Sequence, residues 1–521
     1  MIYSAEQPPA HFNMAQFVIG RAAEATPDKP GLLVIADAVA PRPDEVWSYR
    51  QLEQAVLSAA AALLAEGLKP GDRVLIRLDN TSAYALLFFA AIAAGLVPIP
   101  ASSQLTAREA DFLLADSGAS AIAAAAQLAL GDVPPGVRIL SEAWVARALQ
   151  GTATAAGYAA TNANDPAYLV YTSGTTSNPK GVLHAQRAAW GRRPMVEGWY
   201  GLTPNDRVLH AGAFNWTYTL GTGLTDPWAN GATAMVFTGD KDPAVWPALI
   251  REHRATIFAA VPTLYRQILK YTEISPRDLA HFRHGLTAGE ALPETLRQEW
   301  RARTGTMLYE ALGMSELSTF LSSSPAVPPK PGTVGRPQAG RSVAILAVDG
   351  GEQPLPAGAI GLLAAHRTDP GLMLGYWQRP EEEREAFRGD WFIGGDLCSM
   401  DTEGYVTHHG RANDLMNAMG YRVSPMEVEH VIAGHPWVAE VAAAEVQVRQ
   451  GVSIIAAFIV LKEGVSPDTA SRQSVSDFAG ERLAAYKQPR EIVYVKSLPR
   501  TPNGKIKRAE LRQNYARDRS S

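Results

Sequence analysis

Hydrophobic and polar positions alternate with two different periods along the first two thirds of the chain. Short apolar runs, typical of buried strands, occur at 72–78, 121–123, 167–171, 206–210 and 256–260. Between them, apolar residues recur at helical spacing at 14–25, 48–67, 82–94 and 107–117, with Ser48 placed to cap the second of these helices. This alternation predicts an α/β fold with a parallel sheet covered by helices on both faces.

The pattern changes in the last third. Strands near 343–348 and 361–365 predict a small, β-barrel-like subdomain, and the charged run 381–385 predicts a solvated helix face. A helix from about Pro425, strands at 438–444, 452–460 and 491–495, and an amphipathic helix at 474–483 then predict a compact α+β unit. We therefore expect a large N-terminal domain, 1–412, and a small C-terminal domain, 413–521.

Composition narrows the class of protein. A chain of 521 residues exceeds what one core supports, and 46% hydrophobic with 19% charged residues is ordinary for a globular protein. A net charge of −4 argues against binding to nucleic acid or to an anionic membrane. Cys398 is the only cysteine, which excludes a disulfide framework within the chain and a thiolate metal site.

The N-terminal residues lack the basic region and apolar core of a signal peptide. The most apolar run, 83–100, contains Gly95 and Pro98 and is too short to span a bilayer, so we expect a buried helix leading into a strand. We expect a cytoplasmic protein.

The loop from Thr172 to Gly181 is the strongest chemical signal. It follows the strand 167–171 and is rich in hydroxyl and glycine residues, and Lys180 adds a cation. Exposed backbone N–H groups, hydroxyls and one ammonium suit a polyphosphate. The order differs from the nucleotide P-loop because Lys180 precedes Gly181, and a plain surface turn is the alternative.

Other polar stretches follow in a fixed order. They are 286–293, 309–316, 391–396, 410–429 and 498–508. Taken singly, each has a simpler interpretation: Glu316 as a helix-start carboxylate, Asp396 as a turn residue, and the basic tail as a solvated end. Taken together with 172–181, they resemble the motifs of the acyl-adenylate-forming enzymes, which include acyl-CoA synthetases, peptide-synthetase adenylation domains and luciferases.

The resemblance implies a nucleotide site. Its ATP- or AMP-binding residues would be Thr172, Ser173, Gly174, Thr175, Thr176, Lys180, Gly289, Glu290, Ala311, Leu312, Gly313, Asp396, Arg411 and Arg422. Its catalytic residues would be Lys505, Ser315 and Glu316, with Glu316 also holding Mg²⁺. Leu312 departs from the family, which often has Tyr at that position against adenine.

The resemblance also implies an acyl pocket and a hinge. The pocket would be formed by Phe214, Trp216, Tyr218, Ala288, Gly289, Ala311 and Gly313, and its aromatics are similar to those of benzoate-type CoA ligases; a plain core role for these aromatics is the alternative. The resemblance implies that the small C-terminal domain is mobile. Asn413 falls at its hinge, where the family usually has Asp or Lys, and Gly420 and Tyr421 would approach CoA.

The implied activity is an AMP-forming acid–CoA ligase that uses ATP, Mg²⁺ and CoA, with benzoate or a related aromatic acid as substrate. Alternatives are a medium-chain or alicyclic acid, loading of a carrier-protein thiol, and a catalytically silent nucleotide-binding or scaffold protein. Retention of Lys505, Glu316 and Asp396 argues against the silent protein. A homodimer, and regulation by a lysine acetyltransferase and deacetylase acting on Lys505, are left open.

Overall fold

The computed structural model describes residues 6–151, 157–172, 179–414, 416–418, 421–449, 452–500 and 506–520. The side chains of Asn413, Asn417, Ala418, Tyr421, Arg422, Val452 and residues 518–520 are not described. Within these ranges, none of the helices has both the length and the apolar character needed to cross a membrane.

Chain contacts divide the molecule into two compact units. The first comprises Met1–Val343 and Ala365–Phe392, and the second comprises Ala344–Ala364 and Ile393–Ser521. The second unit thus includes strands that precede residue 413. A compact unit need not coincide with a body that rotates, so a domain boundary at residue 412 stays a prediction.

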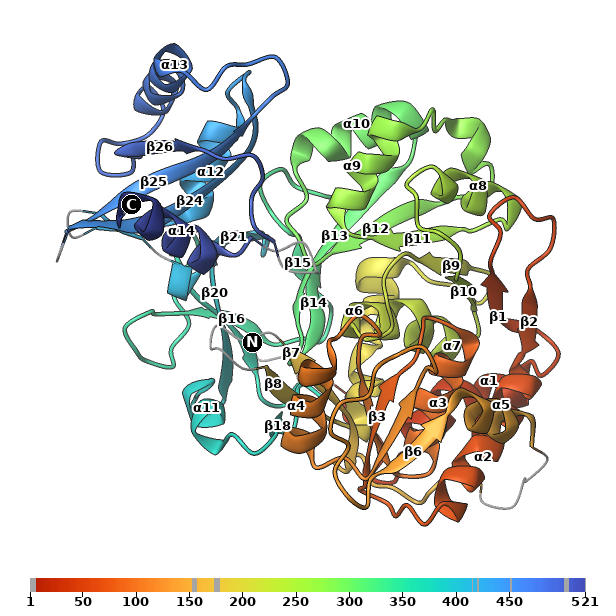
Figure 1. Cartoon of the computed structure of the whole chain (residues 1–521). Helices are drawn as coiled ribbons and strands as arrows, with labels where there is room; N and C mark the ends of the chain where they lie inside the picture. Colours follow the sequence, from red (N-terminus) through yellow and green to blue (C-terminus); the bar gives the residue numbers. More distant parts are fainter. Residues whose placement is uncertain are drawn as a thin grey trace. The chain divides into compact units, whose positions relative to one another are not determined.

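The first unit is built on a nine-stranded sheet (Figure 1). In spatial order its strands are β15 (Arg336–Pro337), β14 (Ser318–Ser322), β13 (Met307–Met314), β12 (His284–Ala288), β11 (Ile257–Ala260), β9 (Arg207–His210), β10 (Thr233–Phe237), β1 (Pro30–Ile35) and β2 (Glu45–Ser48). The strands from β13 to β1 run parallel, whereas β14, β15 and β2 are antiparallel additions at the two edges. The predicted parallel α/β architecture is confirmed.

Two smaller sheets complete this unit. One is parallel throughout, in the order β4 (Val97–Pro100), β3 (Arg73–Arg77), β5 (Ala121–Ala124) and β6 (Arg138–Ser141). The other is antiparallel, in the order β18 (Gly375–Tyr376), β8 (Lys180–Ala185) and β7 (Pro166–Thr172). The phosphate loop therefore connects two neighbouring antiparallel strands.

Helices cover these sheets. They are α1 (Arg21–Ala25), α2 (Tyr49–Ala65), α3 (Ser82–Ala93), α4 (Ala107–Ser117), α5 (Glu142–Gln150), α6 (Thr217–Leu220), α7 (Asp226–Ala229), α8 (Val245–Glu252), α9 (Pro262–Tyr271), α10 (Glu294–Thr304) and α11 (Pro380–Glu385). Ser48 caps α2 as predicted, because its hydroxyl accepts the N–H of Gln51 while Gln51 accepts the N–H of Ser48. The apolar α3 is almost wholly buried and leads into β4, as expected.

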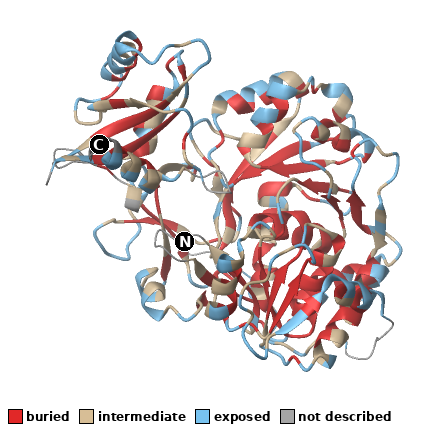
Figure 2. Ribbon diagram, viewed as in Figure 1, coloured by how far each residue is buried: buried red, intermediate tan, exposed pale blue. Residues whose placement is uncertain are grey.

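The second unit holds the remaining elements. One five-stranded sheet contains β16 (Val343–Leu346), β17 (Gly361–His366), β20 (Trp391–Met400), β21 (Val406–Arg411) and β19 (Phe387–Arg388). The second unit contributes most of this sheet. There follow the hairpin β22 (Met416–Ala418) and β23 (Tyr421–Val423), the sheet β24 (Val438–Arg449), β25 (Val452–Leu461) and β26 (Glu491–Tyr494), and helices α12 (Pro425–Ala433), α13 (Thr469–Gly480) and α14 (Arg508–Ser520). In Figure 2 the strands of the nine-stranded sheet are mostly buried, while the outer faces of α10, in the first unit, and of α13, in the second unit, are exposed.

One helix boundary was predicted wrongly. We expected an amphipathic helix at 474–483, but α13 begins at Thr469 and ends at Gly480. The Asp468 carboxylate accepts from the N–H of Ser471, and the Ser471 hydroxyl accepts from the N–H of Asp468. This reciprocal cap starts the helix one turn before the apolar periodicity does.

Candidate active site

The base of the phosphate loop is fixed by a strand pair. Thr172 ends β7 and Lys180 begins β8, and the two residues are register partners. Ser173, Gly174, Thr175 and Thr176 lie outside the described residues. Lys180 forms an ion pair with Glu382 of α11, and its ammonium lies 5.4 Å from the centroid of the Tyr376 ring. The predicted solvated helix 381–385 is present, yet one of its carboxylates holds the lysine of the loop.

Ser315 and Glu316 lie in the turn between β13 and β14, so the alternative of a helix start is wrong. His184 Nε2 lies 2.8 Å from the Ser315 carbonyl oxygen. The hydroxyl of Tyr376 donates to Glu316 Oε1 at 2.7 Å, and the N–H of Met373 donates to the Glu316 carbonyl oxygen at 2.8 Å. Because β8 carries both Lys180 and His184, the strand that leaves the phosphate loop also holds this turn.

His184 is buried, and its ring stacks on that of Tyr168 at 4.6 Å. Its pKa is lowered to about 4, mainly by burial; the hydrogen bond to Ser315 opposes this shift, and the nearby charges of Arg187 and Arg192 add to it. The unfolded state therefore binds the proton more tightly.

We expect the free energy of unfolding to fall as pH drops from about 6.5 to 4, because His184 is neutral only in the folded state over that window. Each such histidine contributes up to about 1.4 kcal/mol per pH unit. Urea unfolding of wild type and His184→Gln between pH 7 and 4.5 measures this, and the variant should show a shallower dependence. His281→Gln, at an exposed position, controls for the loss of a histidine. Equal slopes for wild type and His184→Gln would contradict the expectation.

A buried ion pair lies behind the same turn. The Arg192 guanidinium donates to both carboxylate oxygens of Asp226, at 2.8 and 2.6 Å, and the Arg192 and Asp226 side chains are only 7% and 5% exposed. Arg192 also donates to the hydroxyl of Ser318, the first residue of β14. Ser318 has a φ of 71°, which is unusual for a residue with a side chain. The arginine thus restrains the end of the turn that carries Glu316.

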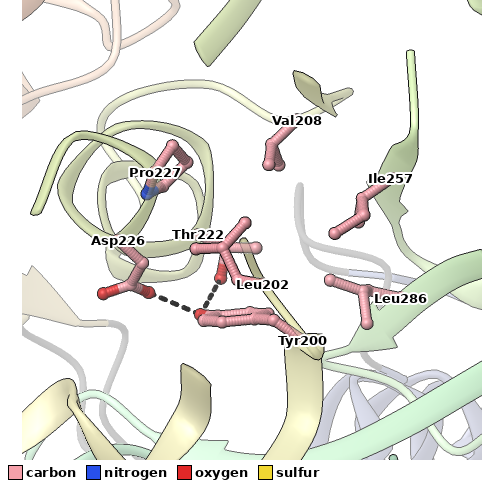
Figure 3. Close-up of a pocket in the computed structure, with 8 residues that line it drawn as sticks. All are labelled: Tyr200, Leu202, Val208, Thr222, Asp226, Pro227, Ile257 and Leu286. Atoms are coloured by element: carbon pink, nitrogen blue, oxygen red, sulfur yellow. Dashed lines mark hydrogen bonds between the residues drawn. The ribbon is translucent and has the colours of Figure 1, made fainter. Parts of the chain in front are cut away.

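Tyr200 completes this cluster. Its hydroxyl donates to Asp226 at 2.5 Å and lies 3.0 Å from the hydroxyl of Thr222, as Figure 3 shows. The pocket drawn there is lined by Tyr200, Leu202, Val208, Thr222, Asp226, Pro227, Ile257 and Leu286. It has essentially no space for a water molecule, so in this conformation it is a packing gap and no substrate site.

The aromatic part of the predicted acyl pocket is brought together. Trp216 immediately precedes α6, and its ring lies 5.3 Å from that of Tyr218 at 88°. A Cβ added to Gly289 would lie 2.9 Å from the Trp216 indole, and Gly289 has a φ of 89°. Glycine is therefore required there for both its conformation and its size.

Not all of the other residues predicted for the site pack around Tyr218. Ala288 and Ala311 are register partners on β12 and β13 and pack in one hydrophobic cluster with Tyr218. Leu312 and Gly313 follow on β13, and Glu290 accepts a hydrogen bond of 2.7 Å from the hydroxyl of Thr263. Phe214, in contrast, packs against Tyr84 in a different cluster, with ring centroids 5.6 Å apart.

Asp396 lies within β20, so its alternative as a turn residue is wrong. The second unit surrounds its carboxylate with His408 Nε2 and Arg411 Nη1, each at 3.1 Å. Burial by itself would raise the pKa of Asp396, but the hydrogen bond from His408 and the charge of Arg411 outweigh it and hold the pKa below its usual value. The group is thus kept as a carboxylate, the form that accepts hydrogen bonds from hydroxyls.

The structure describes the remaining predicted residues only in part. Asn413 lies in a 3₁₀ turn, Ala412–Asp414, and Tyr421 and Arg422 begin β23, but their side chains are not described. Gly420 and Lys505 lie outside the described residues. No sequence pattern indicated that His184, Arg192, Asp226, Tyr376 and Glu382 lie at or near the site. Only the position of His184, four residues after Lys180 on one strand, could have indicated its place.

The fold agrees with the comparisons to known proteins. A model of the AMP-binding enzyme family matches residues 19–377, and a model of the AMP-binding enzyme C-terminal domain matches residues 427–505. The chain belongs to the AMP-binding enzyme family, the acyl-adenylate-forming enzymes whose motifs it resembles.

Several relatives are similar over nearly the whole length. The benzoate–CoA ligase of Thauera aromatica is 32% identical, over 97% of this chain and 96% of the relative. The 3-hydroxybenzoate–CoA ligase of Aromatoleum sp. (strain CIB) is 30% identical, over 96% of each chain. The crystal structure of the anthranilate CoA ligase AuaEII in complex with anthranoyl-AMP has a TM-score of 0.86 and 27% identity, over 97% of this chain and 98% of that chain.

Proposed function

We propose that this AMP-forming acid–CoA ligase activates benzoate or a related aromatic acid. The observation that carries the proposal is the contact of Trp216 with Tyr218 and with Gly289, where planar side chains meet a turn without side-chain bulk. Planar walls suit a planar acyl group. The similarity to ligases named for benzoate and 3-hydroxybenzoate supports it. A medium-chain or alicyclic acid is the alternative for the same pocket.

In the first step, a carboxylate oxygen of the acid attacks the α-phosphorus of ATP, and the bond to pyrophosphate breaks. The nucleophile is already ionised at neutral pH, so no general base is needed. Two anions must meet, so the protein contributes positioning and positive charge. Lys505 would contact the carboxylate and phosphate oxygens, Ser315 the α-phosphate, and the 172–180 loop the pyrophosphate.

Glu316 would hold Mg²⁺. Tyr376 holds one oxygen of this carboxylate, and the described residues contain no cluster of three or more metal-ligating side chains. A single carboxylate suits Mg²⁺, which usually keeps waters and takes further oxygens from substrate phosphates. The ion would neutralise phosphate charge there.

Lys180 and Glu316 must exchange partners to perform these roles. Lys180 is paired with Glu382, and Glu316 with Tyr376. Binding of MgATP would replace the Glu382 carboxylate with phosphate oxygens as the partner of Lys180. Asp396, held ionised by Arg411, would accept the ribose hydroxyls.

In the second step, the CoA thiolate attacks the acyl carbonyl carbon, and AMP leaves. We propose that the C-terminal domain rotates about Asn413 between the steps, so that Lys505 withdraws and Gly420 approaches the thiol arm. Loading of a carrier-protein thiol is the alternative second step.

Asn413→Pro should impair thioester formation more than adenylation, because proline fixes φ at the hinge. Pyrophosphate release measures the first step, and conversion of supplied acyl-AMP with CoA measures the second. Asn413→Ala separates loss of the side chain from restriction of the backbone. Unchanged kinetics of Asn413→Pro in both steps would remove residue 413 as the hinge.

The function is tested by AMP release with MgATP and CoA across benzoate, substituted benzoates, cyclohexanecarboxylate and linear C2–C10 acids. A preference for aromatic acids is expected. Preference for linear or alicyclic acids would refute the aromatic pocket and keep the ligase. AMP release only after a carrier protein is added would refute CoA as the acceptor.

A further inference from the structure

The floor of the proposed acyl pocket carries a histidine. His210 ends β9 and is paired with Ala259 of β11, which is paired in turn with Leu286 of β12. Side chains two positions apart on a strand point to one face, so Ala288 lies on the same face as Leu286. Ala259, Leu286 and Ala288 pack in one cluster with Tyr218. His210 therefore faces the side of the sheet on which the proposed pocket stands.

The tautomer of His210 follows from its backbone contact. The N–H of Gly212 donates to His210 Nδ1 at 2.9 Å, so this nitrogen carries no proton and Nε2 does. The side chain is buried, and burial together with the charge of Lys241 lowers its pKa to about 3. The ring is neutral at physiological pH, and its Nε2 proton finds no acceptor among the described residues.

A second unmatched polar group lies beside it. Thr219 of α6 is 1% exposed, and its hydroxyl has no hydrogen-bond partner within the described part of the chain. A Cβ placed on Gly212 would lie 2.2 Å from Thr219 Oγ1 and 2.9 Å from His210 Cε1. The two groups thus flank one residue, and together they offer an N–H donor and a hydroxyl that can accept.

The aromatic wall connects this pair to the ring site. The Tyr218 ring meets His210 edge to face, with centroids 4.5 Å apart at 75°. It meets Trp216 edge to face as well, and it stacks on Trp199 at 5.8 Å. A ring bound against Trp216 and Tyr218 would extend towards His210. Buried polar groups are normally paired, so this pair calls for a partner that carries both an acceptor and a donor.

We propose that His210 and Thr219 bind a hydroxyl substituent on the aromatic acid, with the substrate oxygen accepting from His210 Nε2 and the substrate proton donated to Thr219 Oγ1. The substrate class is then a ring-hydroxylated benzoate. This rests on the proposed aromatic acid–CoA ligase activity and names the subsite that selects within it.

The test compares kcat/KM for 3-hydroxybenzoate and 4-hydroxybenzoate with kcat/KM for benzoate. In wild type, one hydroxybenzoate should be favoured by at least about tenfold, because benzoate leaves a buried donor unpaired. Thr219→Val, which keeps the shape, and His210→Leu should each lower this ratio about tenfold. Thr287→Val is the matched control: it removes another buried, unpartnered hydroxyl, from the opposite face of β12, and should leave the ratio unchanged.

Equal kcat/KM for all three acids in wild type would overturn the subsite but not the proposed aromatic acid–CoA ligase activity. It would indicate that a buried water pairs with both groups. An unchanged ratio in Thr219→Val and His210→Leu would also overturn it. A loss of activity that is equal for all acids assigns these residues to packing and likewise overturns it. No turnover of any aromatic acid would refute the proposed function together with the subsite.

Discussion

An enzyme carrying Lys505→Ala will convert supplied acyl-AMP and CoA to acyl-CoA, yet it will release almost no pyrophosphate from acid and MgATP. The reason is electrostatic: the first step brings a carboxylate to a polyphosphate, and the Lys505 ammonium is proposed to bridge the two anions. Loss of one such contact costs at least about a hundredfold in kcat. The second step has no such encounter and should change little.

The two half-reactions are measured separately, by pyrophosphate release and by thioester formation. Lys507→Ala is the matched control, because Lys507 lies two residues further along and pairs with Glu510 at 3.6 Å. It should retain adenylation within a few-fold. Equal loss of both half-reactions in Lys505→Ala would refute the proposed role.

The second large effect concerns stability. Arg192→Met should lower the free energy of unfolding by about 3–5 kcal/mol, because it leaves the buried carboxylate of Asp226 without its counter-charge. The Tyr200 hydroxyl would still donate to Asp226, but a neutral donor does not replace a guanidinium. Denaturant unfolding followed by tryptophan fluorescence measures the change.

A double variant separates the ion pair from its packing. Replacing both Arg192 and Asp226 with apolar residues should cost less than Arg192→Met alone, because no charge is then left buried. Arg50→Met is the surface control: Arg50 and Asp28 are paired at 3.1 Å but are 54% and 85% exposed, and the loss should stay below about 1 kcal/mol. A loss for Arg192→Met as small as that for Arg50→Met would contradict the expectation.

Local sequence patterns were sufficient where one element sets its own structure. Ser48 made the start of α2 recognisable, and the helix predicted at 107–117 was found with those bounds. The start of α13 was missed because its cap precedes the apolar period.

Contacts between distant segments were not predictable in this way. Glu382 belonged to a charge run whose composition indicates only solvent exposure, yet it pairs with Lys180, about 200 residues earlier in the chain. Arg192 and Asp226 showed no helical or strand spacing relative to each other, and Phe214 resembled its aromatic neighbours although it packs against Tyr84. Such pairs depend on strand order, which local periodicity does not encode.

The sequence by itself determined the succession of strands and helices, the α/β class and the ordered motifs, because these depend on residue periodicity and on short spacings along the chain. Only the tertiary structure decided which partners Lys180, Glu316 and Asp396 have, and that His210 Nε2 and the Thr219 hydroxyl have no partner among the described residues. Those facts follow from the order in which β8, β9, β12, β18 and β20 enter their sheets. Because these groups are buried, water cannot replace a missing partner, so each hydrogen bond made or left unmade changes the free energy.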